Sequence, residues 1–202
     1  MVTAALVVAN LLVFLFELSL GEDVDGFIRR WGLVPADIGD APGAWITLLT
    51  SLFLHAGWLH LGSNLLYLAV FGPPVERRLG GVRFAVVFLA SGVMGNVVHL
   101  LVQPTSTVPA IGASGAISGL IAAHLVLFPG ATLGSLAPVL FLHVVESTPV
   151  LFLLLVWLAA QLFLGVASLT SNTSVAWWAH VGGFLTGLAF ASLLKGRRRL
   201  RN

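Results

Sequence analysis

Long uncharged apolar runs restrict the fold of this chain more than any other feature of its sequence. A helix needs about 20 apolar residues to cross the hydrocarbon core of a bilayer, which is about 30 Å thick. The sequence contains six such runs, of which the second and the fourth are the shortest. These two runs predict helices that begin or end inside the membrane, where other parts of the protein must cover their backbone. The sequence therefore predicts an all-α, polytopic membrane helix bundle of six transmembrane helices, at about 3–20, 59–71, 84–102, 114–128, 149–168 and 175–194.

The composition is typical of a membrane protein and excludes several other classes. Of the 202 residues, 58% are hydrophobic and only 9% are charged, which is too little charge to cover a soluble globular surface. A soluble enzyme and a DNA-binding domain are therefore excluded, and no nucleic acid partner is expected. The sequence has no repeat of fixed period and no soluble appended segment, so residues 1–202 are expected to form a single transmembrane domain.

The positions of the basic residues predict the orientation of the bundle. Arg77, Arg78 and Arg83 lie between the second and third runs, and Lys195 is followed by four arginines after the sixth run. Because loops rich in lysine and arginine stay in the cytoplasm, we expect a multi-pass protein of the cell membrane, a bacterial inner membrane in particular, with both termini cytoplasmic. Proline and glycine interrupt the segment 128–148, which we expect to be an interfacial or partly re-entrant cytoplasmic loop.

Strongly polar residues are few in the predicted spans, and they gather in three places. Such groups cost free energy in lipid, so those at membrane depth are candidates for function. In the predicted orientation all three places lie toward the outer leaflet, where one site between helices can contain them. The places are His55, His60 and Asn64 near the start of the second span, 112–115 at the start of the fourth, and 179–183 near the start of the sixth.

Ser114 is the candidate nucleophile. It opens the fourth run, where the first N–H groups of a helix have no intrahelical partner and the helix dipole favours an anion. A serine hydroxyl needs a base to take its proton, and His180 lies at the same predicted depth on another helix. Small residues four positions apart on both helices predict close packing that brings His180 to Ser114. These residues are Gly115 and Gly119 on one helix, and Gly183 and Gly187 on the other.

His60 and Asn64 are candidate donors to an oxyanion. They are four residues apart and therefore share one face of the second helix. Together with the N–H of Ser114, and with Gly112 allowing a substrate backbone to come close, they are expected to stabilise the negative charge of a tetrahedral intermediate. A run such as Gly-Ala-Ser-Gly is by itself more often only a packing face. The occurrence of a nucleophile, a base and donors at one depth favours a catalytic site.

Other polar residues receive a structural interpretation. His124 lies ten residues after Ser114, which is about 15 Å along a helix and too far to share the site. His99 and Asn96 are expected to form an interhelical hydrogen bond. Gln161 in the fifth span can face either a substrate or a neighbouring helix, and the sequence leaves both possibilities open.

Four motifs, in order along the chain, resemble those of the rhomboid intramembrane serine proteases. The resemblance implies a six-helix bundle with a serine and histidine dyad below the membrane surface, in which Ser114 is the nucleophile and His180 the general base and acid. His60 and Asn64 would be the oxyanion donors. It also implies that the substrates are the transmembrane segments of other proteins in the lipid bilayer, and that no metal or cofactor takes part. The motifs are SLFLHAGWLHLGSN at 51–64, GPPVERRLG at 72–80, GASG at 112–115 and HVGG at 180–183.

Two positions depart from the pattern of that family. Many members carry an aromatic residue one helical turn after the nucleophile, where it stacks on the histidine, but this chain has Ser118. Another group must then orient His180. Many members also have a Trp-Arg pair in the first outer loop, whereas here Trp45 is followed by Ile46.

Two other functions compete with proteolysis. One is a catalytically weak or inactive rhomboid-like protein that binds membrane clients, and the other is a small transporter that uses His60 and His180 as a proton relay. The other classes of intramembrane protease are excluded by chemistry. The sequence has no H-E-x-x-H motif for a zinc protease and no aspartate in any predicted span for an aspartyl protease.

Overall fold

The computed structural model describes residues 1–39, 43–132, 149–169 and 175–199, which form a helical bundle. Most of the loop predicted at 128–148 lies outside the described residues. Within the described part of the chain there is no strand, only two isolated β-bridges. The α-helices are α1 (Val2–Ser19), α2 (Val24–Trp31), α3 (Thr47–Thr50), α4 (Trp58–Leu79), α5 (Gly81–Val102), α6 (Ser114–Leu127), α8 (Val150–Ser168) and α9 (Trp177–Arg199).

The predicted all-α membrane bundle is confirmed. Of the described helices, α1, α5, α8 and α9 are long and apolar enough to cross a bilayer. A fifth span results if the bent pair Ala44–Phe53 and α4 is counted as one. The 14 residues of α6 make it shorter than a full span, so the count of six spans stays a prediction.

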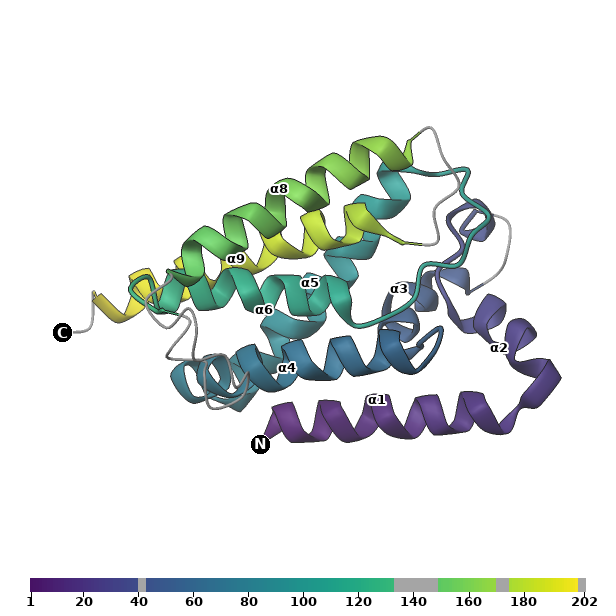
Figure 1. Ribbon diagram of the computed structural model, residues 1–202, viewed down its shortest axis with the longest axis horizontal. Helices are drawn as coiled ribbons and strands as arrows, with labels where there is room; N and C mark the ends of the chain where they lie inside the picture. Colours follow the sequence, from purple (N-terminus) through teal and green to yellow (C-terminus); the bar gives the residue numbers. More distant parts are fainter. Residues whose placement is uncertain (40–42, 133–148, 170–174, 200–202) are drawn as a thin grey trace.

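The helices are arranged around a central group made of α5, α6 and α9. Figure 1 shows α8 on one side of this group, α4 and α1 on the other, and α2 and α3 at one end. The start of α1 and the end of α9 lie at the opposite end, on the same side of the molecule. The largest buried side chains between the central helices include Phe84, Phe88 and Leu120, and they form the main apolar core.

Glycines line the contact between α6 and α9. A Cβ atom on Gly183 would overlap the carbonyl oxygen of Gly115, and one on Gly187 would overlap the backbone of Gly119. Helix backbones come this close where both helices carry small residues at a spacing of four. The predicted packing of these two glycine faces is confirmed, and we name the contact the glycine seam. It brings the start of α6 beside the start of α9.

The second predicted helix is longer in the structure than in the sequence analysis. We expected it to end near residue 71, but α4 continues to Leu79 and includes Pro73 and Pro74. The predicted end was wrong because the apolar run stops at these prolines and a charged residue, Glu76, follows them. A hydropathy pattern does not show that Glu76 forms hydrogen bonds inside the protein.

Glu76 caps the amino-terminal end of α1. Its carboxylate accepts hydrogen bonds from the N–H of Val2 at 2.6 Å and from the N–H and the hydroxyl of Thr3 at 2.9 and 2.6 Å. The first N–H groups of a helix have no partner within the helix, and a negative charge there also interacts favourably with the helix dipole. The last turns of α4 are thereby joined to the first turn of α1.

We expect the substitution Glu76→Ala to lower the free energy of unfolding by about 2 kcal/mol, because it leaves buried donors of α1 without an acceptor. The measurement is the unfolding transition in mixed micelles with increasing denaturing detergent. Glu22→Ala is the matched control, since Glu22 is an exposed carboxylate. Equal transitions for the two variants would contradict the capping role.

The segment that precedes α6 is fixed by backbone hydrogen bonds. Leu33 and Ala110 exchange N–H···O bonds of 3.1 and 2.7 Å, and the N–H of Gly112 donates to the carbonyl of Ser51 at 2.8 Å. Gly112 has a φ of +112°, which side-chain-bearing residues rarely adopt. Two features therefore fix the position of Ser114. They are the backbone hydrogen bonds of the segment before α6 and the glycine seam between α6 and α9.

Candidate active site

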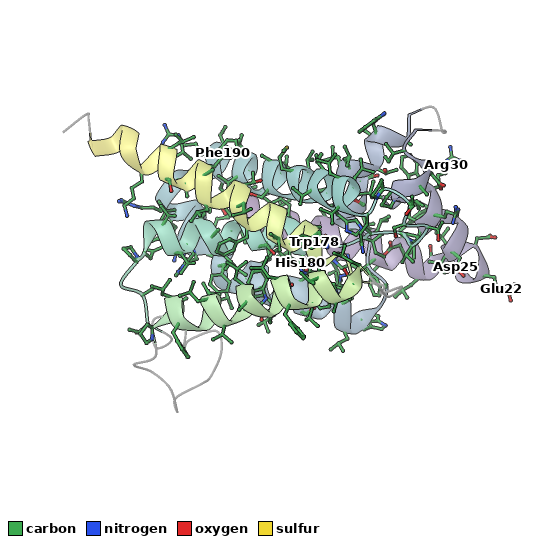
Figure 2. The ribbon with its side chains drawn as sticks, turned by 90° about the horizontal axis from the view of Figure 1, so that it is seen from above. Glu22, Asp25, Arg30, Trp178, His180 and Phe190 are labelled. Carbon is green, nitrogen blue, oxygen red and sulfur yellow. The ribbon has the colours of Figure 1, made fainter. Side chains whose placement is uncertain are left out.

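Ser114 and His180 meet where α6 and α9 begin. Ser114 is the first residue of α6, and His180 is the fourth residue of α9. The Oγ of Ser114 lies 2.7 Å from the Nε2 of His180, which is hydrogen-bond distance. Figure 2 shows His180 inside the bundle, whereas Glu22, Asp25 and Arg30 lie at one end of it. The fold therefore brings together two residues that are 66 positions apart in the chain.

Gln161 of α8 contacts the other ring nitrogen of His180. Its Oε1 lies 2.6 Å from Nδ1 of the imidazole, and the side chain is buried. An amide oxygen can only accept a hydrogen bond, so Nδ1 carries the ring proton and Nε2 has a free lone pair toward Ser114. Of the two possibilities that the sequence left open, the structure places Gln161 against a neighbouring helix.

His60 and Asn64 of α4 converge on Gly112. A Cβ atom on Gly112 would lie 2.6 Å from the Nε2 of His60 and 3.5 Å from the Nδ2 of Asn64. The Nδ1 of His60 accepts the N–H of Ala56 at 3.3 Å, which leaves the ring proton on Nε2, the nitrogen nearest Gly112. One hydrogen of the Asn64 amide goes to the carbonyl of His60 at 3.1 Å, and the other remains for a ligand.

A cavity of about 520 Å³ lies beside these residues. This volume is in the range of ligand sites in proteins, about 300–1,000 Å³. Polar groups from three helices reach its wall, and the remainder of the wall is mostly apolar. The polar members include His60 and Asn64 of α4, Ser114 of α6 and His180 of α9, and the large apolar members include Tyr67, Ile117 and Trp157.

A family match covers most of the chain together with this site. Residues 42–197 match the rhomboid domain, and this range contains all of Ser114, His180, His60 and Asn64. The chain belongs to the rhomboid family. The resemblance predicted from the four motifs is thus confirmed, and the apolar helices make this rhomboid a multi-pass membrane protein.

Several known proteins are similar to this rhomboid. It is 34% identical over 169 residues to "Putative rhomboid protease YdcA" of Bacillus subtilis (strain 168), covering 81% of this chain and 75% of that protein. It is 36% identical over 115 residues to "Rhomboid protease GluP" of the same organism, covering 57% and 22%. It is also 34% identical over 111 residues to "Inactive rhomboid protein 1" of Drosophila melanogaster, covering 55% and 8%. The chain thus spans three quarters of the first relative and less than a quarter of the other two.

The aromatic contacts of His180 come from positions that the sequence analysis did not select. Trp177 meets the imidazole edge-on at 5.8 Å between ring centroids, and Trp157 lies at 6.4 Å with an interplanar angle of 31°. Ser118 instead donates its hydroxyl to the carbonyl of Ser114 at 2.7 Å. In this rhomboid the ring of His180 is therefore packed by α8 and by the start of α9, and not from the position one turn after Ser114.

Two further histidines lie outside the cavity wall, as predicted for His124, whereas His55 belongs to the same candidate group as His60 in the sequence analysis. His124 packs against Phe71 and Phe128, and His55 precedes α4, with its ring 5.1 Å from that of His60. Within the part of the chain that the structure describes, no group of three or more His, Cys, Asp or Glu side chains is arranged to hold a metal ion.

Asn96 forms a hydrogen-bonded bridge between elements. Its Nδ2 donates to the carbonyl of Leu48 at 2.9 Å and to the hydroxyl of Ser51 at 2.8 Å. The buried Nδ1 of His99, by contrast, has no hydrogen-bond partner among the described residues. The predicted bridge is confirmed for Asn96, and it supports the residue whose carbonyl holds Gly112.

Proposed function

We propose that this rhomboid is an intramembrane serine endopeptidase. The observation that carries the proposal is the 2.7 Å hydrogen bond between Ser114 Oγ and His180 Nε2. It occurs in a family with members that are named as proteases. In this proposal Ser114 is the nucleophile, and His180 acts first as general base and then as general acid.

The reaction proceeds through an acyl-enzyme, as in other serine hydrolases. Ser114 Oγ attacks the scissile carbonyl carbon while its proton moves to His180 Nε2, and the carbonyl oxygen becomes an oxyanion. The C–N bond then breaks, and His180 gives the proton to the leaving amine. A water molecule that His180 deprotonates attacks the ester, and the second product leaves as Ser114 recovers its proton.

The donors for the oxyanion come from α4 and from the start of α6. They are the Nε2–H of His60, the second N–H of Asn64 and the backbone N–H of Ser114, and they are grouped around Gly112. Donors that are fixed before the reaction stabilise the charge that develops in the transition state without further reorganisation.

The proposed substrates are transmembrane proteins. The cavity is bounded by α4 on one side and by α8 and α9 on the other, and its mostly apolar wall fits an apolar peptide segment. In a helix the carbonyl groups are hydrogen-bonded along the axis, so a segment must unwind locally before Ser114 can attack it.

We place the protein in a cell membrane, with a bacterial inner membrane and cytoplasmic termini as the specific proposal, and we treat 1–202 as one domain.

A second candidate function is the binding of membrane clients without cleavage. The similarity to "Inactive rhomboid protein 1" favours it, although that match covers only 8% of the relative. Against it stands the hydrogen bond between Ser114 and His180, which client binding does not require.

The test of the proposed function is cleavage in proteoliposomes that contain a single-span reporter tagged at both ends. Gel analysis detects cleavage, mass spectrometry locates the cut, and a fluorophosphonate probe reports covalent attack by a serine. We expect a cut in or beside the reporter span and an adduct on Ser114, and neither with the variant His180→Ala. Capture of the reporter without a cut and without an adduct would favour client binding.

The oxyanion donors give a separate prediction. We expect Asn64→Ala and His60→Ala each to lower kcat by about 10²–10³-fold, as the loss of one oxyanion donor does in other enzymes. Steady-state kinetics of the reporter in proteoliposomes measures the effect. Gly62→Ala is the control, because Gly62 lies between the two residues on α4 and a Cβ there would have no atom within 4 Å. A near-normal kcat in both alanine variants would contradict the assignment.

A further inference from the structure

We propose that Gln161 is the positioning residue of this active site, holding His180 in the ring orientation and tautomer that allow Nε2 to take the proton of Ser114. The inference rests on the proposed function and adds a third residue to the pair formed by Ser114 and His180. Gln161 acts through His180 and is not placed in contact with the substrate. Gln161 thereby takes the place of the aromatic residue that many rhomboids have at the position of Ser118.

A hydrogen bond joins Gln161 of α8 to His180 of α9. The Oε1 of Gln161 is 2.6 Å from His180 Nδ1, on the side of the ring opposite to Ser114. A neutral imidazole carries one proton, and the hydrogen bond made by one nitrogen decides which nitrogen carries it. An acceptor at Nδ1 therefore selects the tautomer with a proton at Nδ1 and a lone pair at Nε2.

The opposite orientation of the Gln161 amide would leave His180 unable to act as a base. If the amide nitrogen of Gln161 faced the ring, it would donate to Nδ1 and the ring proton would lie on Nε2. His180 would then point a proton at the Ser114 hydroxyl and could not remove one from it. After proton transfer both ring nitrogens of His180 are donors, and the amide oxygen of Gln161 still accepts one of them.

The aromatic contacts of His180 cannot replace this hydrogen bond. Trp157 and Trp177 pack against the imidazole and restrict the plane of the ring. Packing of this kind scarcely distinguishes the two orientations that differ by a half-turn about the Cβ–Cγ bond, because these have nearly the same shape. A hydrogen bond to one ring nitrogen does distinguish them. Ser118 does not serve this purpose, since its hydroxyl donates to the carbonyl of Ser114 and both ring nitrogens of His180 bond to other residues.

An amide side chain in an apolar membrane helix costs free energy unless it is paired. Gln161 is the single amide-bearing or charged residue of α8, which is otherwise rich in leucine, valine and alanine. Polar side chains in membrane helices face the protein interior and pair there. Gln161 is 6% exposed, whereas its neighbours Leu162 and Phe163 are 42% and 74% exposed. The helix is therefore oriented so that this amide faces the bundle.

The experiment compares Gln161→Leu, which removes the acceptor at similar size, with Gln161→Glu, which keeps an acceptor oxygen. Gln103→Leu is the matched control, because Gln103 also holds α8, through Ser168 at 3.1 and 3.3 Å, but does not touch His180. We expect Gln161→Leu to lower kcat and the rate of fluorophosphonate labelling on the order of 10²-fold with little change in KM, and Gln161→Glu to restore both rates. Gln103→Leu should retain both.

A second measurement reads the tautomer directly. Solid-state NMR of the protein with ¹⁵N-labelled histidine distinguishes protonated from unprotonated ring nitrogens, and the His180 signals are those that disappear in His180→Ala. We expect the wild type to have a protonated Nδ1 and an unprotonated Nε2, and Gln161→Leu to have a mixture. This readout does not depend on activity, and if Gln161→Leu fails to fold it is read in the wild type and in Gln161→Glu: a proton at Nδ1 in both supports the role of Gln161, and a proton at Nε2 in the wild type overturns it.

The outcomes separate this proposal from the proposed function. A wild type protonated at Nε2, or equal rates for Gln161→Leu and wild type, would overturn the role of Gln161; cleavage and labelling by the wild type report separately whether the protein is a protease. A rate loss of the same size in Gln103→Leu would also overturn it, because general loosening of α8 would then explain the effect. A wild type that neither cleaves nor reacts with the probe would overturn the proposed function itself.

Discussion

Replacing Ser114 by alanine is expected to reduce cleavage of a single-span reporter by at least about 10³-fold, to the background rate. The hydroxyl is the group that we propose to form the acyl-enzyme, and no other hydroxyl lies within hydrogen-bond distance of the His180 imidazole among the described residues. The variant should fold normally, because the change removes one oxygen atom and adds no volume to the glycine seam. Reporter cleavage and fluorophosphonate labelling in proteoliposomes measure the loss.

The matched control for this substitution is Ser91→Ala. Ser91 of α5 is a fully buried serine, whereas Ser114 is partly buried, and the Ser91 hydroxyl has no hydrogen-bond partner in the described part of the chain. Its removal should leave both cleavage and folding close to wild type, since no bond is lost. Wild-type cleavage by Ser114→Ala would refute the nucleophile assignment. A variant that no longer cleaves the reporter but still captures it would be suited to trapping natural substrates.

Introducing leucine at Gly187 is expected to lower the free energy of unfolding by about 3 kcal/mol or more. A Cβ at this position would already overlap the backbone of Gly119, and the remaining atoms of leucine would force α6 and α9 apart. Because Ser114 and His180 lie on these two helices, the fraction that still folds should also lose their hydrogen bond. Detergent unfolding measures stability, and fluorophosphonate labelling of the folded fraction measures the state of the site.

Ala189→Leu is the control for this second substitution. Ala189 lies two residues further along α9 and is exposed, so a leucine there adds the same kind of side chain on the outer face of the helix. We expect it to unfold and react like the wild type. If Gly187→Leu retained wild-type stability, the close backbone approach at the glycine seam would not be needed for folding.

The sequence predicts the membrane helices well where apolar runs are bounded by charge or by glycine and proline. The ends of α1, α5, α6 and α8 lie within a few residues of the predicted ones, because the free energy of placing side chains in lipid depends mostly on composition. The same physics identifies Ser114 and His180, since a polar residue in an apolar run is conspicuous. It fails for α4, where the Glu76 carboxylate accepts hydrogen bonds from a helix more than 70 residues earlier in the chain.

Other parts of the site depend on orientation, which a hydropathy pattern does not contain. Gln161 is visible in the sequence as an amide in an apolar helix, but only the rotation of α8 decides that it faces His180 and not lipid. Trp157 and Trp177 give no signal at all, because tryptophan is also common at the surfaces of membranes. Amides in apolar helices next to the helix of a candidate base are a signal that identifies Gln161. No such signal identifies Trp157 or Trp177.

In the proposed protease, the hydrogen bond between Gln161 and His180 affects the energetics of substrate entry. One face of α8 is exposed, and the helix crosses the protein beside the cavity, so moving it away from α9 opens the cavity and breaks this bond in the same step. Lateral opening and the orientation of the base are then thermodynamically linked, and each must shift the equilibrium of the other by the same free energy. A substrate that enters beside α4 meets a base that is already oriented. A substrate that displaces α8 has to wait until the helix returns before its peptide bond can be cut.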